Sequence, residues 1–235
     1  MSINTYHYKI LLLGILFGFL LTSCNSVNYR FSNEKYLRMN AINTQALKMY
    51  EGIHDTVFVR LKNNEGQFLL DMKYATAENF LKTPVYDCSE CYLRMKTIRN
   101  LIEANNEFLQ LGYRIKLFDC YRPLDIQMKM WQIMPNADYV ADPQKGSIHN
   151  RGGAVDLTLV DLNGVELDMG TPFDHFGPEA AHAYKKLTKK VRANRALLKE
   201  IMLRHNFKSF KSEWWHYNVF ESNKDPLANF KWICN

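Results

Sequence analysis

The sequence lacks several features that would assign it at once to a functional class. It contains no internal repeat, no low-complexity tract and no glycine-rich phosphate loop, and the one adjacent pair among its 11 glycines is Gly152-Gly153. A single Cys-x-x-Cys, at Cys88–Cys91, has no second copy, which argues against a zinc ribbon. No apolar run reaches the roughly 18 residues of a membrane-spanning helix. A repeat scaffold, a P-loop enzyme and a polytopic membrane protein are therefore not indicated.

The composition is that of an ordinary globular protein. The chain has 235 residues, of which 47% are apolar and 23% charged, enough for one well-cored domain. Much of its net charge of +6 lies between Lys185 and Arg195. We interpret this basic run as a solvated helix face, with attraction to anionic wall polymers or lipid headgroups as the alternative. Aromatic residues do not interleave with it, so neither nucleic acid nor a protein partner is expected.

The N-terminus has the pattern of an export signal. Lys9 precedes a nearly apolar run from Ile10 to Leu21, which has the length of a signal-peptide core. The following Leu21-Thr22-Ser23-Cys24 resembles the lipobox of bacterial lipoproteins; a plain secretory signal or a membrane anchor is the alternative. We therefore predict a signal peptide over 1–23, lipidation of Cys24, a tether over 24–43 and a folded domain over 44–235. The protein would be exported and held at a bacterial membrane, on the periplasmic side, by its lipid.

Four cysteines follow Cys24, namely Cys88, Cys91, Cys120 and Cys234. Export would allow disulfides, and four cysteines permit three pairings. The sequence leaves open which of them form.

The apolar pattern predicts an α+β fold. Helical spacing and end signals indicate helices over Leu93–Leu111, Leu124–Met134 and Pro178–Arg204. Strands are predicted over Val57–Leu61, Phe68–Tyr74, Tyr113–Leu117, Val155–Leu159, Val165–Leu167 and Trp215–Phe220. We expect a mainly antiparallel sheet with helices packed against it.

Two short stretches together predict a metal site in a cleft on this sheet. Residues 147–156 read Ser-x-His-x-x-Gly-x-Ala-x-Asp, and residues 213–216 read Glu-x-Trp-His. The imidazoles of His149 and His216 and the carboxylate of Asp156 suit one zinc ion. Three protein ligands with a fourth position open are typical of a catalytic zinc, whereas a structural zinc is usually closed by a fourth Cys or His.

The same stretches contain residues suited to hydrolysis. Glu213, three residues before His216, is the candidate general base and later the acid that protonates the leaving amine. Arg122, at the end of a predicted strand and before Pro123, is the candidate for stabilising an oxyanion. Because side chains alternate along a strand, a bend near Trp214 is needed to bring Glu213 and His216 to one ion. The pattern predicts zinc-dependent hydrolysis.

These motifs resemble those of the zinc peptidases that share a fold with lysostaphin-like enzymes, D-Ala-D-Ala metallopeptidases and hedgehog domains. Three further stretches, at 71–80, 119–123 and 168–174, are similar to those of the VanX-type D-alanyl-D-alanine dipeptidases. The resemblance implies one zinc held by His149, Asp156 and His216. It implies Glu213 and Arg122 as catalytic residues, and Ser147 and Asp174 as the binding site for the amino end of a small dipeptide.

The activity that the resemblance implies is hydrolysis of D-Ala-D-Ala in peptidoglycan metabolism. A zinc DD- or LD-carboxypeptidase acting on longer stem peptides is the alternative enzyme, and a non-catalytic zinc-containing binding domain is the alternative of another class. Two features differ from the family pattern. Cys120 stands where a smaller residue is expected, and the Cys88-x-x-Cys91 motif corresponds to no requirement of the family.

Overall fold

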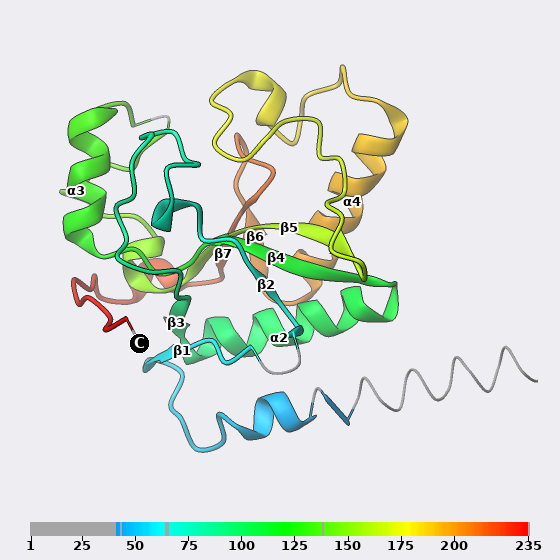
Figure 1. The fold of residues 1–235 in the computed structure, drawn as a ribbon, viewed down its shortest axis with the longest axis horizontal. Coiled ribbons are helices and arrows are strands. Elements are labelled where there is room, and N and C mark those ends of the chain that lie inside the picture. Colours follow the sequence, from blue (N-terminus) through cyan, green and yellow to red (C-terminus); the bar gives the residue numbers. More distant parts are fainter. Residues whose placement is uncertain (1–40, 43, 64–65, 138, 235) are drawn as a thin grey trace, which may run out of the picture. The chain divides into compact units, whose positions relative to one another are not determined.

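A five-stranded sheet lies at the centre of the fold, with strand order β2-β4-β5-β7-β6 (Figure 1). The computed structural model describes residues 41–42, 44–63, 66–137 and 139–234, and we describe the compact unit Asn43–Asn235 by itself. The strands are β2 (Leu69–Leu70), β4 (Tyr113–Asp119), β5 (Ala154–Asp161), β6 (Phe207–Ser209) and β7 (His216–Val219). Only β2 and β4 pair in parallel, so the predicted, mainly antiparallel sheet is confirmed.

Helices α2 (Met95–Gln110) and α4 (Lys189–Arg204) pack against strands of this sheet. Helix α2 runs along one face, below the sheet in the view of Figure 1. Its buried apolar residues Ile98, Leu101, Ile102 and Phe108 follow helical spacing, which explains why this segment forms an amphipathic helix. Helix α4 packs on β6 and α2, and α3 (Leu124–Ile133) follows β4. The α+β class is thereby established.

One predicted helix is too long. Within Pro178–Arg204, a 3-10 turn covers Pro178–Ala180 and α4 begins only at Lys189. The carbonyls of Glu179 and Ala181 accept hydrogen bonds from the buried Arg195 guanidinium, and the Ala181 carbonyl also accepts from the amide of Tyr184 in a turn. The side chain of Thr188 then accepts a bond from the amide of Val191 and caps the helix.

Several strands also differ from the prediction. Val165–Leu167 forms one isolated bridge to β5, and Phe68–Tyr74 contains only the two-residue β2 before a 3-10 turn at Lys73–Ala75. Strand β3 (Tyr92–Arg94) takes up the first residues of the predicted helix Leu93–Leu111, which begins only at Met95, and the three-residue β6 was not predicted. Strand β3 pairs with β1 (Phe58–Arg60) in a separate two-stranded sheet.

Two disulfides resolve the pairing that the sequence left open. Cys88 is joined to Cys234 and Cys91 to Cys120, across 146 and 29 residues. Among the described residues, no helix combines the length and apolar character needed to cross a membrane. The predicted signal, Cys24 and nearly all of the predicted tether lie outside the described residues.

Candidate active site

The sheet aligns three of the polar residues in one row. In the ladder, Asp156 on β5 lies opposite Asp119 on β4 and opposite His216 on β7. Cross-strand partners are nearest neighbours on one face of a sheet, so these three side chains meet without help from loops. Glu213 lies outside β7, which begins at His216, so the expected bend between them is present.

His149 reaches this row from the loop before β5. It begins a 3-10 turn, His149–Arg151, which ends at Gly152 with a φ of 67°. A Cβ at Gly152 would lie 2.2 Å from the ring of Phe58, so both the left-handed backbone and the close approach require glycine. The Gly of the sequence motif therefore turns the chain from His149 into β5.

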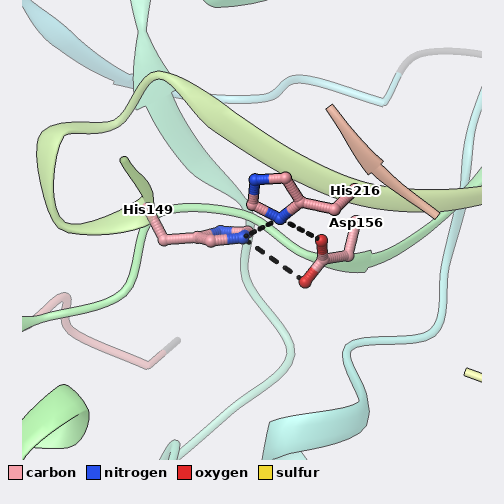
Figure 2. Close-up of side chains that lie close together, drawn as sticks. All are labelled: His149, Asp156 and His216. Carbon is pink, nitrogen blue, oxygen red and sulfur yellow. Dashed lines mark hydrogen bonds and ion pairs between the residues drawn. The ribbon is translucent and has the colours of Figure 1, made fainter. Parts of the chain in front are cut away.

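The two imidazoles and the carboxylate converge on one point (Figure 2). One ligand atom from each of His149, Asp156 and His216 lies within 4.8 Å of the others. Nε2 of His149 is 3.2 Å from Nδ1 of His216, and Asp156 lies 3.4 Å and 3.0 Å from these two nitrogens. Burial raises the pKa of Asp156, but the two imidazoles outweigh this effect and hold the pKa well below its usual range.

Hydrogen bonds on the far side of each ring leave the facing nitrogens as acceptors. Nδ1–H of His149 donates to the carbonyl of Cys120 at 2.7 Å, and Nε2–H of His216 donates to Oδ1 of Asn218 at 2.8 Å. Because each ring donates its proton to an outer partner, the unprotonated nitrogens of His149 and His216 and the Asp156 carboxylate face one another. That donor set repels itself unless a cation lies between, so the residues fit a metal ion.

Glu213 lies beside this group, with Oε2 3.9 Å from Nδ1 of His216. Burial is the main cause that raises the pKa of its carboxyl, to about 7, and the charges of Asp156 and Asp174 add to it. A carboxyl that gains and loses a proton near neutral pH is suited to acid–base catalysis.

Arg122 is fixed by a buried polar network. Its Nε and Nη2 donate to Oδ2 of Asp119, and its Nη1 donates to Oε1 of Gln127. Oδ1 of Asp119 accepts from the hydroxyl of Tyr86 and from the amide of Cys120. Burial opposes the charge of Arg122, but Asp119 and its other neighbours raise its pKa well above the usual value, so it is a permanent cation.

Asp174 lines the same cavity as these residues. Its backbone has a φ of 58°, which is unusual for a residue other than glycine and is tolerated by Asp. The Tyr74 hydroxyl donates to both carboxylate oxygens at 3.2 Å and 3.1 Å. Burial, followed by the charge of Asp156, raises the pKa of Asp174 to about 8.

A cavity of about 260 Å³ joins all seven predicted site residues. Trp215 and the aromatic residues Phe80, Tyr139 and Phe176 also line it. The seven are Arg122, Ser147, His149, Asp156, Asp174, Glu213 and His216.

Sequence reasoning assigned no role to five groups that orient these residues. They are the Cys120 carbonyl and the side chains of Tyr74, Tyr86, Asp119 and Asn218. Asp119 precedes Arg122 by three residues and Asn218 follows His216 by two on one strand face, so both had a spacing signal. The Cys120 carbonyl belongs to the backbone and leaves no such signal in the sequence.

A buried group of two imidazoles and a carboxylate, beside the Glu213 carboxyl in one cavity, could hold a metal ion and assist a hydrolysis. The chain belongs to the D-Ala-D-Ala dipeptidase family of peptidases, whose profile matches residues 55–232.

Curated relatives agree with this assignment. The chain is 36% identical over 166 residues to a D-alanyl-D-alanine dipeptidase of Escherichia coli K12, covering 70% of this chain and 86% of that protein. It is 32% identical over 183 residues to a protein of the same name from Enterococcus faecalis, covering 68% and 90%. A third, from Streptomyces coelicolor, is 31% identical over 176 residues, covering 64% and 85%.

Proposed function

We propose that this protein hydrolyses the dipeptide D-Ala-D-Ala to two molecules of D-alanine, using one zinc ion. The observation that supports this most directly is the meeting of a three-donor metal group, Glu213 and Asp174 in one small cavity. His149, Asp156 and His216 would hold the zinc. The ion, when bound, acts as a Lewis acid on the scissile carbonyl and makes a water molecule acidic near neutral pH.

The protein residues supply the remaining steps. Glu213 takes a proton from the attacking water and then delivers it to the nitrogen of the leaving D-alanine. Arg122, held by Asp119 and Gln127, directs its charge at the oxygen that becomes negative in the transition state. Asp174 and Ser147 bind the amino end of the substrate, and Tyr74 positions the Asp174 carboxylate.

The size of the cavity supports a dipeptide as substrate. Sites for drug-sized ligands usually measure about 300–1,000 Å³, and this cavity of about 260 Å³ is smaller. Its wall includes a cluster of rings from separate segments: Phe176 lies 4.5 Å from Tyr139 and 5.0 Å from Phe80, centroid to centroid. These rings line the same cavity as Asp174 and limit its volume.

The test is release of D-alanine from D-Ala-D-Ala by the oxidised, zinc-loaded domain that lacks residues 1–24. Release that chelation abolishes and zinc restores would support the proposal. Cleavage of stem peptides with no cleavage of the dipeptide would replace it with the carboxypeptidase alternative. Zinc binding with no hydrolysis of either substrate would point to a binding domain.

Substitution of Glu213 separates metal binding from chemistry. We expect Glu213→Ala to retain zinc and to lower kcat by about 10²- to 10⁴-fold, the usual contribution of a general base. Zinc content by metal analysis is the control. Full activity in this variant would remove Glu213 from the mechanism.

We also propose that the protein is exported, lipidated at Cys24 and active in peptidoglycan turnover at the periplasmic side of a membrane. The two disulfides support export, because such bonds persist in oxidising compartments. Metabolic labelling with a fatty acid would test lipidation: Cys24→Ala should abolish the label, and a label that persists would contradict it.

A further inference from the structure

The orientation of one proposed zinc ligand depends on a single backbone carbonyl. The Cys120 oxygen accepts the Nδ1–H bond of His149 at 2.7 Å and so directs Nε2 toward Asp156 and His216. Cys120 itself lies between the end of β4 at Asp119 and the start of α3 at Leu124. The ladder between β4 and β5 shifts register just before this point and does not include Cys120.

Outside the ladder, Cys120 is held by a hydrogen bond from its amide to Asp119, by the backbone bond from Tyr121 to Tyr92, and by a covalent bond. Its Sγ is joined to Cys91, which directly precedes β3, and the carbonyl of Cys91 accepts a backbone hydrogen bond from Leu61. Both cysteines are fully buried. The disulfide therefore ties the residue that orients His149 to the neighbouring two-stranded sheet.

We propose that the Cys91–Cys120 disulfide is a positioning element of the metal centre, and that the zinc affinity of the site depends on it. The bond holds the Cys120 carbonyl at the distance and direction that keep Nε2 of His149 as a free acceptor. This inference rests on the proposed function only in taking His149 as a zinc ligand.

The second disulfide provides a matched control. Cys88–Cys234 closes a segment of 146 residues, against 29 for Cys91–Cys120, so its removal should release more chain entropy on unfolding. Its path to the site runs from Trp232 through Tyr86 to Asp119, which pairs with Arg122 and lies 3.7 Å from Nδ1 of His149, so it reaches a metal ligand through more contacts than the path from Cys120 does. Removing Cys88–Cys234 should therefore lower stability more, whereas removing Cys91–Cys120 should weaken metal binding more.

The experiment compares zinc affinity and thermal stability in the domain lacking residues 1–24. The variants are Cys91→Ala/Cys120→Ala, Cys91→Val/Cys120→Ala to refill the volume, and the control Cys88→Ala/Cys234→Ala. Zinc dissociation constants are measured by competition with a chromogenic chelator, below the Tm of each metal-free protein. We expect about 10- to 100-fold weaker zinc binding in the first two variants, the usual effect of removing an outer partner of a ligand, and little change in the control despite its greater loss of Tm.

Three outcomes would overturn the proposal. These are wild-type affinity in both Cys91/Cys120 variants, an equal loss of affinity in the control, and failure of both variants to fold, which would assign the bond to folding alone. A shift in affinity in a protein that does not cleave D-Ala-D-Ala would leave this inference standing and remove only the proposed substrate.

Discussion

At the scale of single residues, the chain uses neutral hydrogen-bond acceptors to orient both imidazoles. His149 uses the Cys120 carbonyl and His216 uses the Asn218 amide oxygen. A neutral acceptor fixes the tautomer of the ring without itself carrying a charge. Of the two partners, only Asn218 acts through a side chain and can be replaced directly.

Asn218→Leu should therefore weaken zinc binding. Removing the acceptor frees His216 to rotate or to place its proton on Nδ1, and such losses usually cost about 10- to 100-fold in metal affinity. Chelator competition measures the effect, and Asn218→Asp, which restores an acceptor, should recover it. Unchanged affinity in Asn218→Leu would show that the ring is held by packing alone.

We expect Asp174 to determine a different property, the preference for a free amino end. Because the pKa of Asp174 is raised to about 8, this role requires the substrate ammonium to favour the ionised carboxylate. Asp174→Asn removes that carboxylate, and charge-assisted hydrogen bonds of about 1.5–3 kcal/mol correspond to a roughly 10- to 100-fold lower kcat/KM on D-Ala-D-Ala. Tyr74→Phe keeps the carboxylate and should have a smaller effect. The comparison is made at equal zinc content. A wild-type kcat/KM in Asp174→Asn would place the amine elsewhere.

The metal-ligand candidates, together with Glu213 and Arg122, could be predicted from the sequence by residue type and position, whereas the roles of Ser147 and Asp174 followed only from the family resemblance. Their roles stay predictions. The groups that orient these residues were harder to predict from the sequence. The Tyr86 hydroxyl, for example, contacts Asp119 across 33 residues, and no local pattern encodes that contact.

At the scale of secondary-structure elements, the parallel strand β2 is short and is supported by charges at its end. Oδ2 of Asp71, directly after β2, lies 2.7 Å from Nζ of Lys116 on β4 and 2.8 Å from Nζ of Lys73. Burial raises the pKa of Asp71, but the hydrogen bonds and charges of the two lysines outweigh it and the pKa is lowered. The ionised carboxylate therefore stabilises the folded state.

Asp71→Asn should lower the free energy of unfolding at pH 7 by about 0.5–1 kcal/mol, the range for partly exposed ion pairs. Because the pKa of Asp71 is depressed on folding, this contribution is present above its unfolded value near 4 and disappears as the pH falls through the folded value. Urea unfolding of both proteins from pH 7 to pH 2.5 measures it. A difference that persists at the lowest pH would assign the effect to packing.

Long elements were predicted well and their ends less so. The apolar spacing of α2 and the alternation of β5 are determined locally, whereas α4 starts late because Arg195 binds the carbonyls of Glu179 and Ala181 from a distance in the chain. A helix start that depends on such a contact has no local signal beyond the capping Thr188.

At the scale of the whole molecule, the class α+β followed from the order of helices and strands, but the disulfide pairing did not. Pairing depends on which loops meet, and Cys88 and Cys234 are brought together only by the complete fold. Their packing is shared with aromatic residues, since Trp232 contacts Tyr86 and Tyr92.

Removal of the Cys88–Cys234 disulfide should lower the free energy of unfolding. For a segment of 146 residues, loop-closure entropy gives about 3–5 kcal/mol of stabilisation, so Cys88→Ala/Cys234→Ala should unfold at a clearly lower denaturant concentration. Guanidinium titration measures the midpoint, with Cys88→Ser/Cys234→Ser as a second version. A midpoint equal to that of the wild type would mean that the aromatic contacts alone hold the C-terminal segment.

The position of Trp215 in the cavity affects its fluorescence. Its indole is 2% exposed and lines the cavity between Glu213 and His216 in the chain. A shielded indole at a metal site is an internal fluorophore, so its emission should respond when the ion enters, and Co²⁺ or Cu²⁺ in place of zinc should quench it. Metal occupancy could then be followed optically, in real time and without a label.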